Sequence, residues 1–346
     1  MRYENVCVEA AVCRLPDEVV TTGEIEQRLR PVYERLRLPF GRLELMTGIR
    51  ERRLWKQGVR PGKNSVETVL RALEIAGVAP EKVGCLIHGS VCRDYLEPAT
   101  ACGVHHEAGL SEDCVIFDVS NACLGILTGT IQAANMIELG QIDAAVVVGT
   151  EDSRSLLNTT IERMNTDQTL TRRSIKPLFA SLTIGSASAA IVLTHRRISR
   201  LGHRLLGGSV LANTAFCGLC CSDTAPSAGV GDFMKTDSEA LLVQGVDTAR
   251  RLFPKFLQTM NWSRDQIAHF FCHQVGKAHQ KHLFEKLGID VTRNFSTLAS
   301  LGNTGSAALP SALGIACEKN VCRPGEKIAL LGIGSGINAL MLGLEW

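Results

Sequence analysis

Long apolar runs alternate with helix-like patterns along much of the chain. The segments Ala144–Gly149 (AAVVVG) and Ile328–Gly334 (IALLGIG) are almost uninterrupted apolar runs. Such runs are typical of strands that helices cover on both faces. Shorter runs within Lys82–Ser90 and Gln266–Gln274 predict buried strands that each follow a helix. The sequence therefore predicts an α/β protein in which helices sandwich the sheets.

The same plan occurs twice. The segments that begin at Asn121 and Asn303 each read as a turn, a helix of small residues, a polar turn and an apolar strand. This repeat predicts two similar halves, residues 1–195 and 196–346, which meet near HRRISRLGHR (195–204). The polar segment Thr159–Pro177 breaks the rhythm, and we expect it to be an excursion over the surface near a site or an interface.

Composition narrows the function classes. The chain has 346 residues, of which 45% are hydrophobic and 21% charged, which is typical of a globular protein with one or two cores. A net charge of +2 and an aromatic content of 5% give little support to nucleic-acid binding. We therefore expect small-molecule chemistry and no nucleic-acid partner.

The amino terminus and the cysteines indicate the compartment. The start of the chain, MRYENVCVEAAVCRLPDE, carries acidic residues where a signal peptide needs an apolar run, and no segment has the length of a membrane span. Thirteen irregularly spaced cysteines read as reduced thiols, so we expect a cytoplasmic protein. Cys217, Cys220 and Cys221 form the one cluster that suggests a metal, but a zinc site needs further ligands nearby, and we expect no metal.

Cys123 lies in FDVSNACLGI, where a strand pattern gives way to a helix pattern. Free amide groups and the helix dipole at that position stabilise a thiolate, which predicts a lowered pKa for Cys123. The small neighbours Ala122 and Gly125 leave room for a substrate carbonyl. On this evidence alone an inert, buried cysteine remains the commoner explanation.

Two distant residues change that balance. His273 comes just after an apolar strand, and Asn303 lies in a turn between glycines before a helix. Each has an ordinary structural explanation when taken alone. Because the ends of equivalent strands in a duplicated α/β fold converge on one crevice, Cys123, His273 and Asn303 together form a candidate catalytic site.

The order Cys123, His273, Asn303, with GIRERR (48–53) and the terminal GIGSGINALMLGLEW, resembles the thiolase superfamily and specifically its ketoacyl synthase III branch. The resemblance covers essentially the whole chain. It implies the thiolase fold, which is a five-layered αβαβα architecture with two pseudo-symmetric halves, and a homodimer. It also implies that Cys123 takes an acyl group from a thioester, and that His273 and Asn303 bind the thioester carbonyl of a second substrate.

The glycine-rich GIGSG has a place in the same resemblance. The backbone amides of Cys123 and Ser335 are implied to form an oxyanion hole, with Gly334 and Gly336 beside the substrate. A dinucleotide motif would need a helix and a strand after its glycines, and only ten residues follow Gly336. We therefore expect no cofactor other than the coenzyme A thioester that is itself the substrate.

A narrower resemblance lies in SVCRDYLEPATAC (90–102) and RRLW (52–55), which are similar to OleA-type thiolases of long-chain olefin biosynthesis. Those enzymes join two fatty acyl-CoA molecules head to head and leave a β-keto acid. The resemblance implies that Glu97 reaches the partner subunit's active site and acts as the base. A fatty acyl-CoA has no carboxylate to lose, so its condensation needs a base for the α-proton. A solvated loop glutamate is the alternative explanation of Glu97.

Three functions stay open on the sequence. The first is an acyltransferase that performs a non-decarboxylative Claisen condensation of two acyl-CoA thioesters. The second is a decarboxylating ketoacyl synthase III that uses a malonyl carrier protein, and the third is an acyl-binding protein with an inert Cys123. Two departures from the initiating synthases argue against the second: Arg42 replaces their coenzyme A-stacking Trp, and IGSASA (184–189) replaces their GDGA-type turn. The segment ANTAFCGLCCSD (212–223) is expected near an acyl or pantetheine channel, and the acyl chain length stays open.

Overall fold

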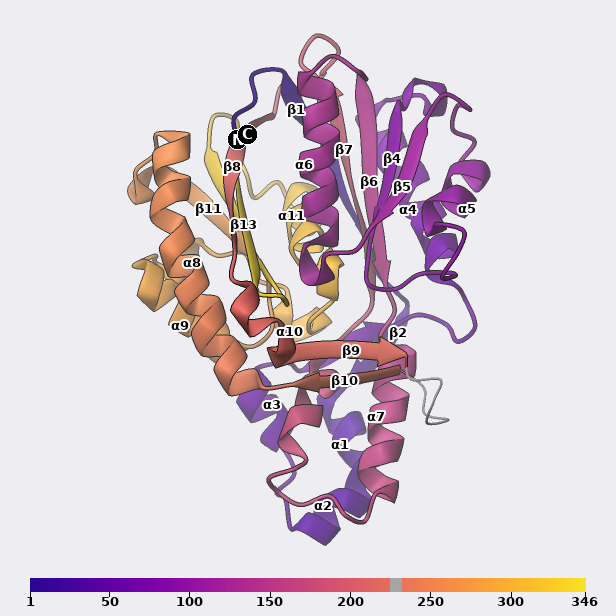
Figure 1. Ribbon diagram of the computed structural model, residues 1–346, viewed down its shortest axis with the longest axis vertical. Helices are drawn as coiled ribbons and strands as arrows, with labels where there is room; N and C mark the ends of the chain where they lie inside the picture. The colour runs from indigo at the N-terminus through magenta and orange to yellow at the C-terminus, as the bar shows by residue number, and fades with distance from the viewer. Residues whose placement is uncertain (225–231) are drawn as a thin grey trace.

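The computed structural model describes residues 1–224 and 232–346. Its centre is a nine-stranded sheet in the order β11-β12-β13-β8-β1-β7-β6-β4-β5 (Figure 1). The strands are β1 (Val6–Arg14), β4 (Cys85–Gly89), β5 (Val115–Val119), β6 (Ala144–Glu151), β7 (Ala187–His195), β8 (Arg204–Ala212), β11 (Ile267–Cys272), β12 (Lys327–Gly334) and β13 (Asn338–Glu345). The four strands predicted from apolar runs correspond to β4, β6, β11 and β12, and they are confirmed.

The sheet consists of two similar parts. Strands β1 and β8, which join them, pair at Cys7 and Arg204. In one part β4 lies parallel to β6, and β7 runs antiparallel to β6; in the other, β11, β12 and β13 repeat that arrangement. Each part therefore contains a parallel pair of strands followed by an antiparallel pair. This is the pseudo-symmetry that the repeated sequence plan predicted.

Helices form three layers around these two parts of the sheet. Helices α4 and α5 cover one outer face, α6 and α11 lie between the two parts, and α8 and α9 cover the other outer face (Figure 1). Their bounds are α4 (Pro61–Ala76), α5 (Thr100–Glu107), α6 (Gly125–Glu138), α8 (Ser238–Met260), α9 (Lys277–Leu287) and α11 (Ala308–Glu318). With the two sheet layers this makes the five-layered αβαβα thiolase architecture, as expected from the sequence.

Small residues hold the central layer close to the strands. A Cβ on Gly129 of α6 would lie 2.7 Å from the side chain of Val147, and one on Gly314 of α11 would lie 2.9 Å from the backbone of Cys13. Both distances are shorter than real Cβ contacts, so the two helices could not pack this closely with larger residues. The small-residue helices of the repeat therefore form the centre of the molecule.

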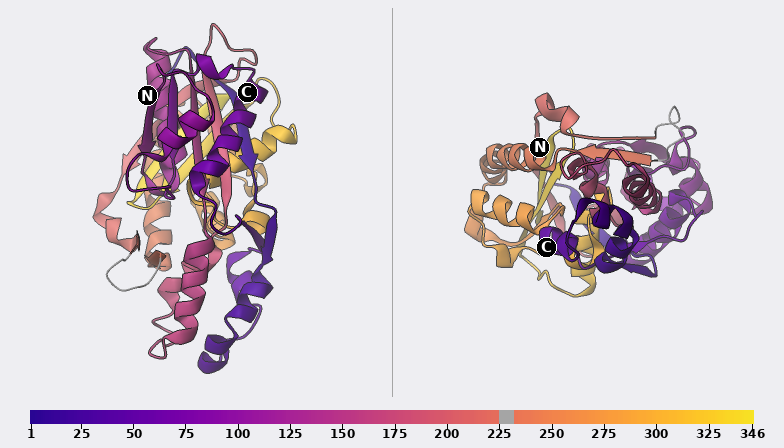
Figure 2. Two further views of the ribbon diagram at one scale, coloured as in Figure 1. Left: turned by 90° about the vertical axis from the view of Figure 1, so that its right-hand side faces the viewer. Right: turned by 90° about the horizontal axis from the view of Figure 1, so that it is seen from below.

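A second lobe projects from one end of the layers (Figures 1 and 2). It contains β2 (Glu18–Thr21), α1 (Thr22–Arg28), α2 (Arg30–Leu36), α3 (Arg42–Thr47), β3 (Glu51–Leu54), α7 (Arg154–Thr166) and the 3₁₀ segment η3 (Lys176–Thr183), with β9 (Cys220–Thr224) and β10 (Asp232–Thr236) lying beside it. The predicted surface excursion, Thr159–Pro177, begins within α7 and ends in η3. Ile161 and Met164 of α7 pack with Ile25 of α1 and with Leu29, which follows that helix. The first part of the excursion is therefore helical, and it shares an apolar core with the other elements of the lobe.

Candidate active site

Cys123 lies in the 3₁₀ turn η2 (Ala122–Leu124) between β5 and α6, at the strand-to-helix junction that the sequence predicted. The preceding residue, Ala122, has a left-handed backbone with φ of 44°. A non-glycine residue in that region costs energy that the surrounding packing must supply. The sharp turn that carries Cys123 is therefore held by its neighbours.

Three glycines supply that packing. A Cβ on Gly125 would lie 2.7 Å from the carbonyl carbon of Gly89, and a Cβ on Gly149 would lie 2.4 Å from the carbonyl oxygen of Gly89. The ends of β4 and β6 and the start of α6 therefore touch through their backbones. This contact fixes the position of Cys123, which lies two residues before Gly125.

The glycine-rich turn between β12 and β13 lies directly against the cysteine. A Cβ on Gly334 would be 3.6 Å from the backbone nitrogen of Cys123. The side-chain amide of Asn338 donates to Oδ1 of Asn121 (3.0 Å), two residues before the cysteine. The structure thus brings Gly334 to Cys123, with Ser335 and Gly336 next along the same turn. The turn joins two antiparallel strands instead of opening a dinucleotide-binding unit.

Asn303 lies in a turn beside the same cysteine. Its backbone forms two hydrogen bonds of 2.9 Å with the segment before β7, through Thr183 and Gly185. Its Oδ1 accepts from the backbone N–H of Gly305 at 3.1 Å. The short 3₁₀ turn that follows, η8 (Gly305–Ala307), contacts η2. The turn of Asn303 and the turn of Cys123 are therefore neighbours.

His273 is the first residue after β11, and its backbone N–H donates to Leu331 of β12 (3.1 Å). Its side chain is buried, and Nδ1 has no hydrogen-bond partner among the described residues. Burial, with a smaller contribution from His279, lowers the pKa of His273 to about 3. The imidazole is therefore neutral at pH 7, and such a ring carries one N–H that can donate a hydrogen bond.

The lowered pKa predicted for Cys123 is wrong. Burial, then the charge of Glu151 and then that of Cys220, raise the pKa of Cys123 to about 12, and only its own backbone N–H acts in the opposite direction. The prediction counted the helix terminus and omitted the loss of solvent around the buried sulfur. Preferential alkylation of Cys123 near neutral pH is therefore not expected, and the exposed Cys217 and Cys221 should react first.

These pKa shifts predict how stability depends on pH. The unfolded chain protonates His273 below its ordinary pKa of 6.5, whereas the folded protein does not, so the free energy of unfolding should fall as the pH drops below about 6.5. The unfolded chain ionises Cys123 above 9.0, whereas the folded protein keeps the thiol, so stability should also fall as the pH rises above 9. Thermal unfolding from pH 5 to 10 measures this, and a melting temperature that rises from pH 6.5 down to 5 would contradict it.

Glu97 lies on the surface of its own chain. It is exposed on the segment between β4 and α5, and its carboxylate makes no hydrogen bond or ion pair within residues 1–224 and 232–346. The segment itself is anchored, because Asp94 accepts from the N–H of Gly62 at the start of α4 (2.8 Å) and Arg60 stacks over Tyr95 (3.9 Å). The chain therefore presents Glu97 outward on a fixed loop.

Two polar residues of the site were missed by the sequence analysis. Glu151 ends β6 and is 6% exposed, and Ser306 follows Asn303 in η8 and is also buried. The hydroxyl of Ser306 donates to Oε1 of Glu151 at 2.5 Å. The signal was available, because Glu151 comes two residues after an apolar strand, the same kind of position that singled out His273.

The segment around Cys220 lies near the site. The charge of Cys220 is one of the causes of the raised pKa of Cys123, so the two thiols are within electrostatic reach. The substrate channel expected along residues 212–223 stays a prediction. In the described part of the chain no three metal-ligating side chains gather into a metal site. None of the described helices combines the length and the apolar character needed to cross a bilayer.

Comparisons with known proteins place this site in a family. Residues 56–196 match the thiolase N-terminal domain, and residues 257–346 match the C-terminal domain of 3-oxoacyl-[acyl-carrier-protein] synthase III. An acyl-CoA:acyl-CoA alkyltransferase from Shewanella oneidensis is 37% identical over 100% of both chains. The chain belongs to the acyl-CoA:acyl-CoA alkyltransferase family. A second member, from Xanthomonas campestris, is 35% identical over 100% of both chains.

Solved structures agree with membership of the acyl-CoA:acyl-CoA alkyltransferase family. A crystal structure of Xanthomonas campestris OleA has a TM-score of 0.95 and 34% identity, with 100% of this chain and 98% of that chain covered. Another, with bound lauric acid and lauroyl-CoA, has a TM-score of 0.94 and 34% identity and covers 99% of this chain and 100% of that chain. The resemblance to OleA-type thiolases inferred from the sequence is confirmed.

Proposed function

We propose that this protein is an acyltransferase that condenses two fatty acyl-CoA molecules without decarboxylation and releases a β-keto acid. The observation that carries the proposal is full-length similarity to acyl-CoA:acyl-CoA alkyltransferases in a chain whose Cys123 lies against a glycine turn and the turn of Asn303. Coenzyme A thioesters are substrates in this account. The nucleophile belongs to the half formed by residues 1–195, and His273 and Asn303 belong to the half formed by residues 196–346.

In the first half-reaction Cys123 accepts an acyl group. Its sulfur attacks the thioester carbonyl, the bond from carbonyl carbon to coenzyme A sulfur breaks, and the proton of the thiol leaves on coenzyme A. The backbone N–H groups of Cys123 and Ser335 stabilise the oxyanion, and Gly334 and Gly336 let the substrate approach them. Because burial keeps Cys123 protonated at rest, its proton must move during the exchange.

In the second half-reaction a carbon–carbon bond forms. The carboxylate of Glu97 removes the α-proton of a second acyl-CoA, and His273 and Asn303 donate hydrogen bonds to its thioester oxygen as the enolate forms. The enolate attacks the acyl group on Cys123 and releases the cysteine thiolate, which regains a proton. Water then cleaves the condensed thioester, so two acyl-CoA and one water give one β-keto acid and two coenzyme A.

Glu97 reaches this chemistry only in a homodimer, which we propose on two features. Strand β5 is an edge of the sheet with half-buried side chains, and edges of that kind need a partner. On the nearby loop Leu96 is 93% exposed, with Val91 and Tyr95 also exposed, and such apolar surface favours an interface.

We place the enzyme in the cytoplasm, because its thirteen cysteines are all unpaired.

Replacement of His273 or Asn303 by Ala tests the division into two half-reactions. Since their hydrogen bonds act on the enolate, either variant should still form the acyl adduct of Cys123, while condensed product falls by roughly a hundredfold or more. Intact-protein mass measures the adduct, and product analysis measures the condensation. An equal loss of both half-reactions would mean that these roles are assigned wrongly.

A decarboxylating reaction is the second candidate function. The match of residues 257–346 to the 3-oxoacyl-[acyl-carrier-protein] synthase III C-terminal domain favours it, with an acyl carrier protein as the partner that brings a malonyl group. A malonyl group forms its enolate by losing CO₂, so that reaction needs no base. Product formation that depends on a malonyl carrier protein and survives Glu97→Gln would support this candidate.

A further inference from the structure

One oxygen of Glu151 connects two loops of the site. Oε1 accepts a hydrogen bond from the backbone N–H of Val91 (3.2 Å), where the loop that carries Glu97 begins. The same oxygen accepts from the backbone N–H of Ser306 (3.2 Å) and from its hydroxyl (2.5 Å), three residues after Asn303. Charge-assisted hydrogen bonds of this kind are strong where water is excluded. The carboxylate therefore ties the two loops to the end of β6.

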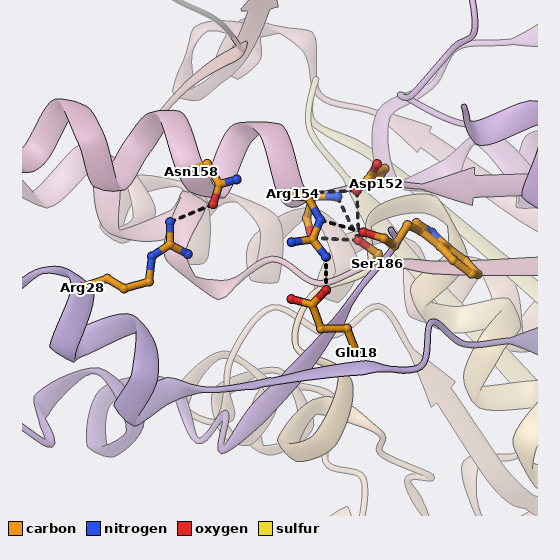
Figure 3. A network of polar contacts seen from close by, with 8 residues as sticks. Glu18, Arg28, Asp152, Arg154, Asn158 and Ser186 are labelled. Atoms are coloured by element: carbon orange, nitrogen blue, oxygen red, sulfur yellow. Dashed lines mark hydrogen bonds and ion pairs between the residues drawn. The ribbon is translucent and has the colours of Figure 1, made fainter. Parts of the chain in front are cut away.

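The end of β6 is itself firmly supported. The indole of Trp55 donates to the carbonyl of Glu151 (3.1 Å), and Nε of Arg154 donates to the carbonyl of Trp55 (2.6 Å). Arg154 also pairs with Glu18 of β2, and the backbone N–H of Ser153 donates to Oγ of Ser186 (3.0 Å) just before β7. Figure 3 shows Arg154 pointing to Glu18, with Asp152 and Ser186 beside it. Contacts from Trp55 and Ser186 thus fix the backbone around Glu151, and with it the position of the carboxylate.

The loop of Asn303 packs closely against the carboxylate of Glu151. Gly305 has φ of +56°, and a Cβ on it would lie 3.0 Å from the carboxylate carbon of Glu151. A larger residue there would push η8 away from β6. The absence of a side chain at Gly305 is therefore what allows the hydrogen bonds of Ser306 to form.

We propose that Glu151 is a positioning residue, whose carboxylate holds the Asn303 turn and the Glu97 loop in register with Cys123. The inference rests on the proposed function, because it concerns the two loops that carry the condensation. Glu151 does not exchange a proton with substrate in this account. Displacements of about 1 Å in such loops cost on the order of a hundredfold in rate.

Comparison of Glu151→Gln with Glu151→Ala tests the proposal. The amide oxygen of Gln can still accept from Val91 and Ser306, so Glu151→Gln should condense acyl-CoA within about threefold of the unchanged protein. Ala removes the acceptor, so condensation should fall by about a hundredfold while the acyl adduct on Cys123 still forms. Equal losses in the two variants would mean that charge or proton transfer is required, and would overturn the positioning role, as would full activity in both.

A second measurement separates this role from general stability. Because the charge of Glu151 helps to raise the pKa of Cys123, both variants should shift the pH midpoint of alkylation of the Cys123 peptide to lower values. Glu9 is also a buried carboxylate, 2% exposed against 6% for Glu151, and it accepts from Ser199 and Arg200 outside the site. Glu9→Ala should lower the melting temperature and leave that midpoint unchanged. An unshifted midpoint in Glu151→Gln would contradict the placement of its carboxylate beside Cys123.

Two further outcomes have a defined reading: a Glu151 variant that does not fold, and an unchanged protein that does not condense acyl-CoA. If Glu151→Ala does not fold, Ser306→Ala takes its place in the experiment. This variant removes the hydroxyl that bonds to Glu151 (2.5 Å) and to the carbonyl of Gly89 (2.9 Å), and it leaves the carboxylate in place. Condensation should then fall by about tenfold, and an unchanged rate overturns the proposal. The unchanged protein could condense no acyl-CoA while the Glu151 variants still shift the alkylation midpoint of Cys123. In that case the proposed function fails and the placement of Glu151 stands.

Discussion

Cys123→Ala should abolish both the acyl adduct and the condensed product. The thiol is the only group in the proposed chemistry that can carry the acyl chain between the two half-reactions, so no partial activity should remain. Incubation with acyl-CoA followed by intact-protein mass should give one acyl group per chain in the unchanged protein and none in the variant. Complete loss of the adduct also excludes an acyl-binding protein with an inert cysteine.

Cys220→Ala is the matched control for that experiment. Cys220 is the thiol whose charge acts on Cys123. Cys220 is therefore the neighbouring thiol best placed to take an acyl group when Cys123 is absent. The control should keep the adduct and the product. An adduct that persists in Cys123→Ala and maps to Cys220 would show that the wrong thiol has been assigned.

Glu97→Gln should keep the acyl adduct and lose the condensation. The change preserves size and polarity but removes the ability to take a proton, and general base catalysis contributes about a hundredfold to ten-thousandfold. Because Glu97 is exposed on an anchored loop, the substitution should leave the melting temperature unchanged. Product yield and intact mass, measured on the same sample, test the separation of the two half-reactions. Retained condensation in Glu97→Gln would remove this residue from the mechanism.

Mixed dimers test whether Glu97 acts across an interface. A dimer of one Cys123→Ala subunit and one Glu97→Gln subunit contains one site with both defects and one intact site. Activity should therefore reappear on mixing two inactive homodimers, at up to half of the unchanged level. If mixed dimers form and remain inactive, Glu97 works within its own subunit or not at all.

Four strands of the main sheet and the place of Cys123 could be predicted because hydrophobic periodicity reports them directly. Continuous apolar runs identified β4, β6, β11 and β12, and the change of period after Cys123 identified the start of α6. The helical nature of α7 was also readable, since Leu157, Ile161 and Met164 follow the spacing of one helix face. It was missed because the polar residues between them dominated the pattern.

The electrostatics of the site could not be predicted in the same way. The pKa of Cys123 depends on how many groups surround the sulfur and on a carboxylate 28 positions further along the chain, and neither follows from local sequence. The role proposed for Glu151 depends on Val91 and Ser306, which come from opposite halves of the chain. Local patterns and the family resemblance predicted which residues carry the chemistry, whereas three-dimensional contacts determine how those residues are held.

The most direct test of the account supplies one long-chain acyl-CoA alone, without any malonyl donor. The purified protein should release two coenzyme A molecules for each β-keto acid, or for each ketone formed from it by loss of CO₂, with the β-keto product identified by mass spectrometry. That ratio follows from one acyl transfer to Cys123 and one hydrolysis of the condensed thioester. If acyl-CoA alone gives no condensed product, and product forms only when a malonyl carrier protein is added, the head-to-head condensation is contradicted.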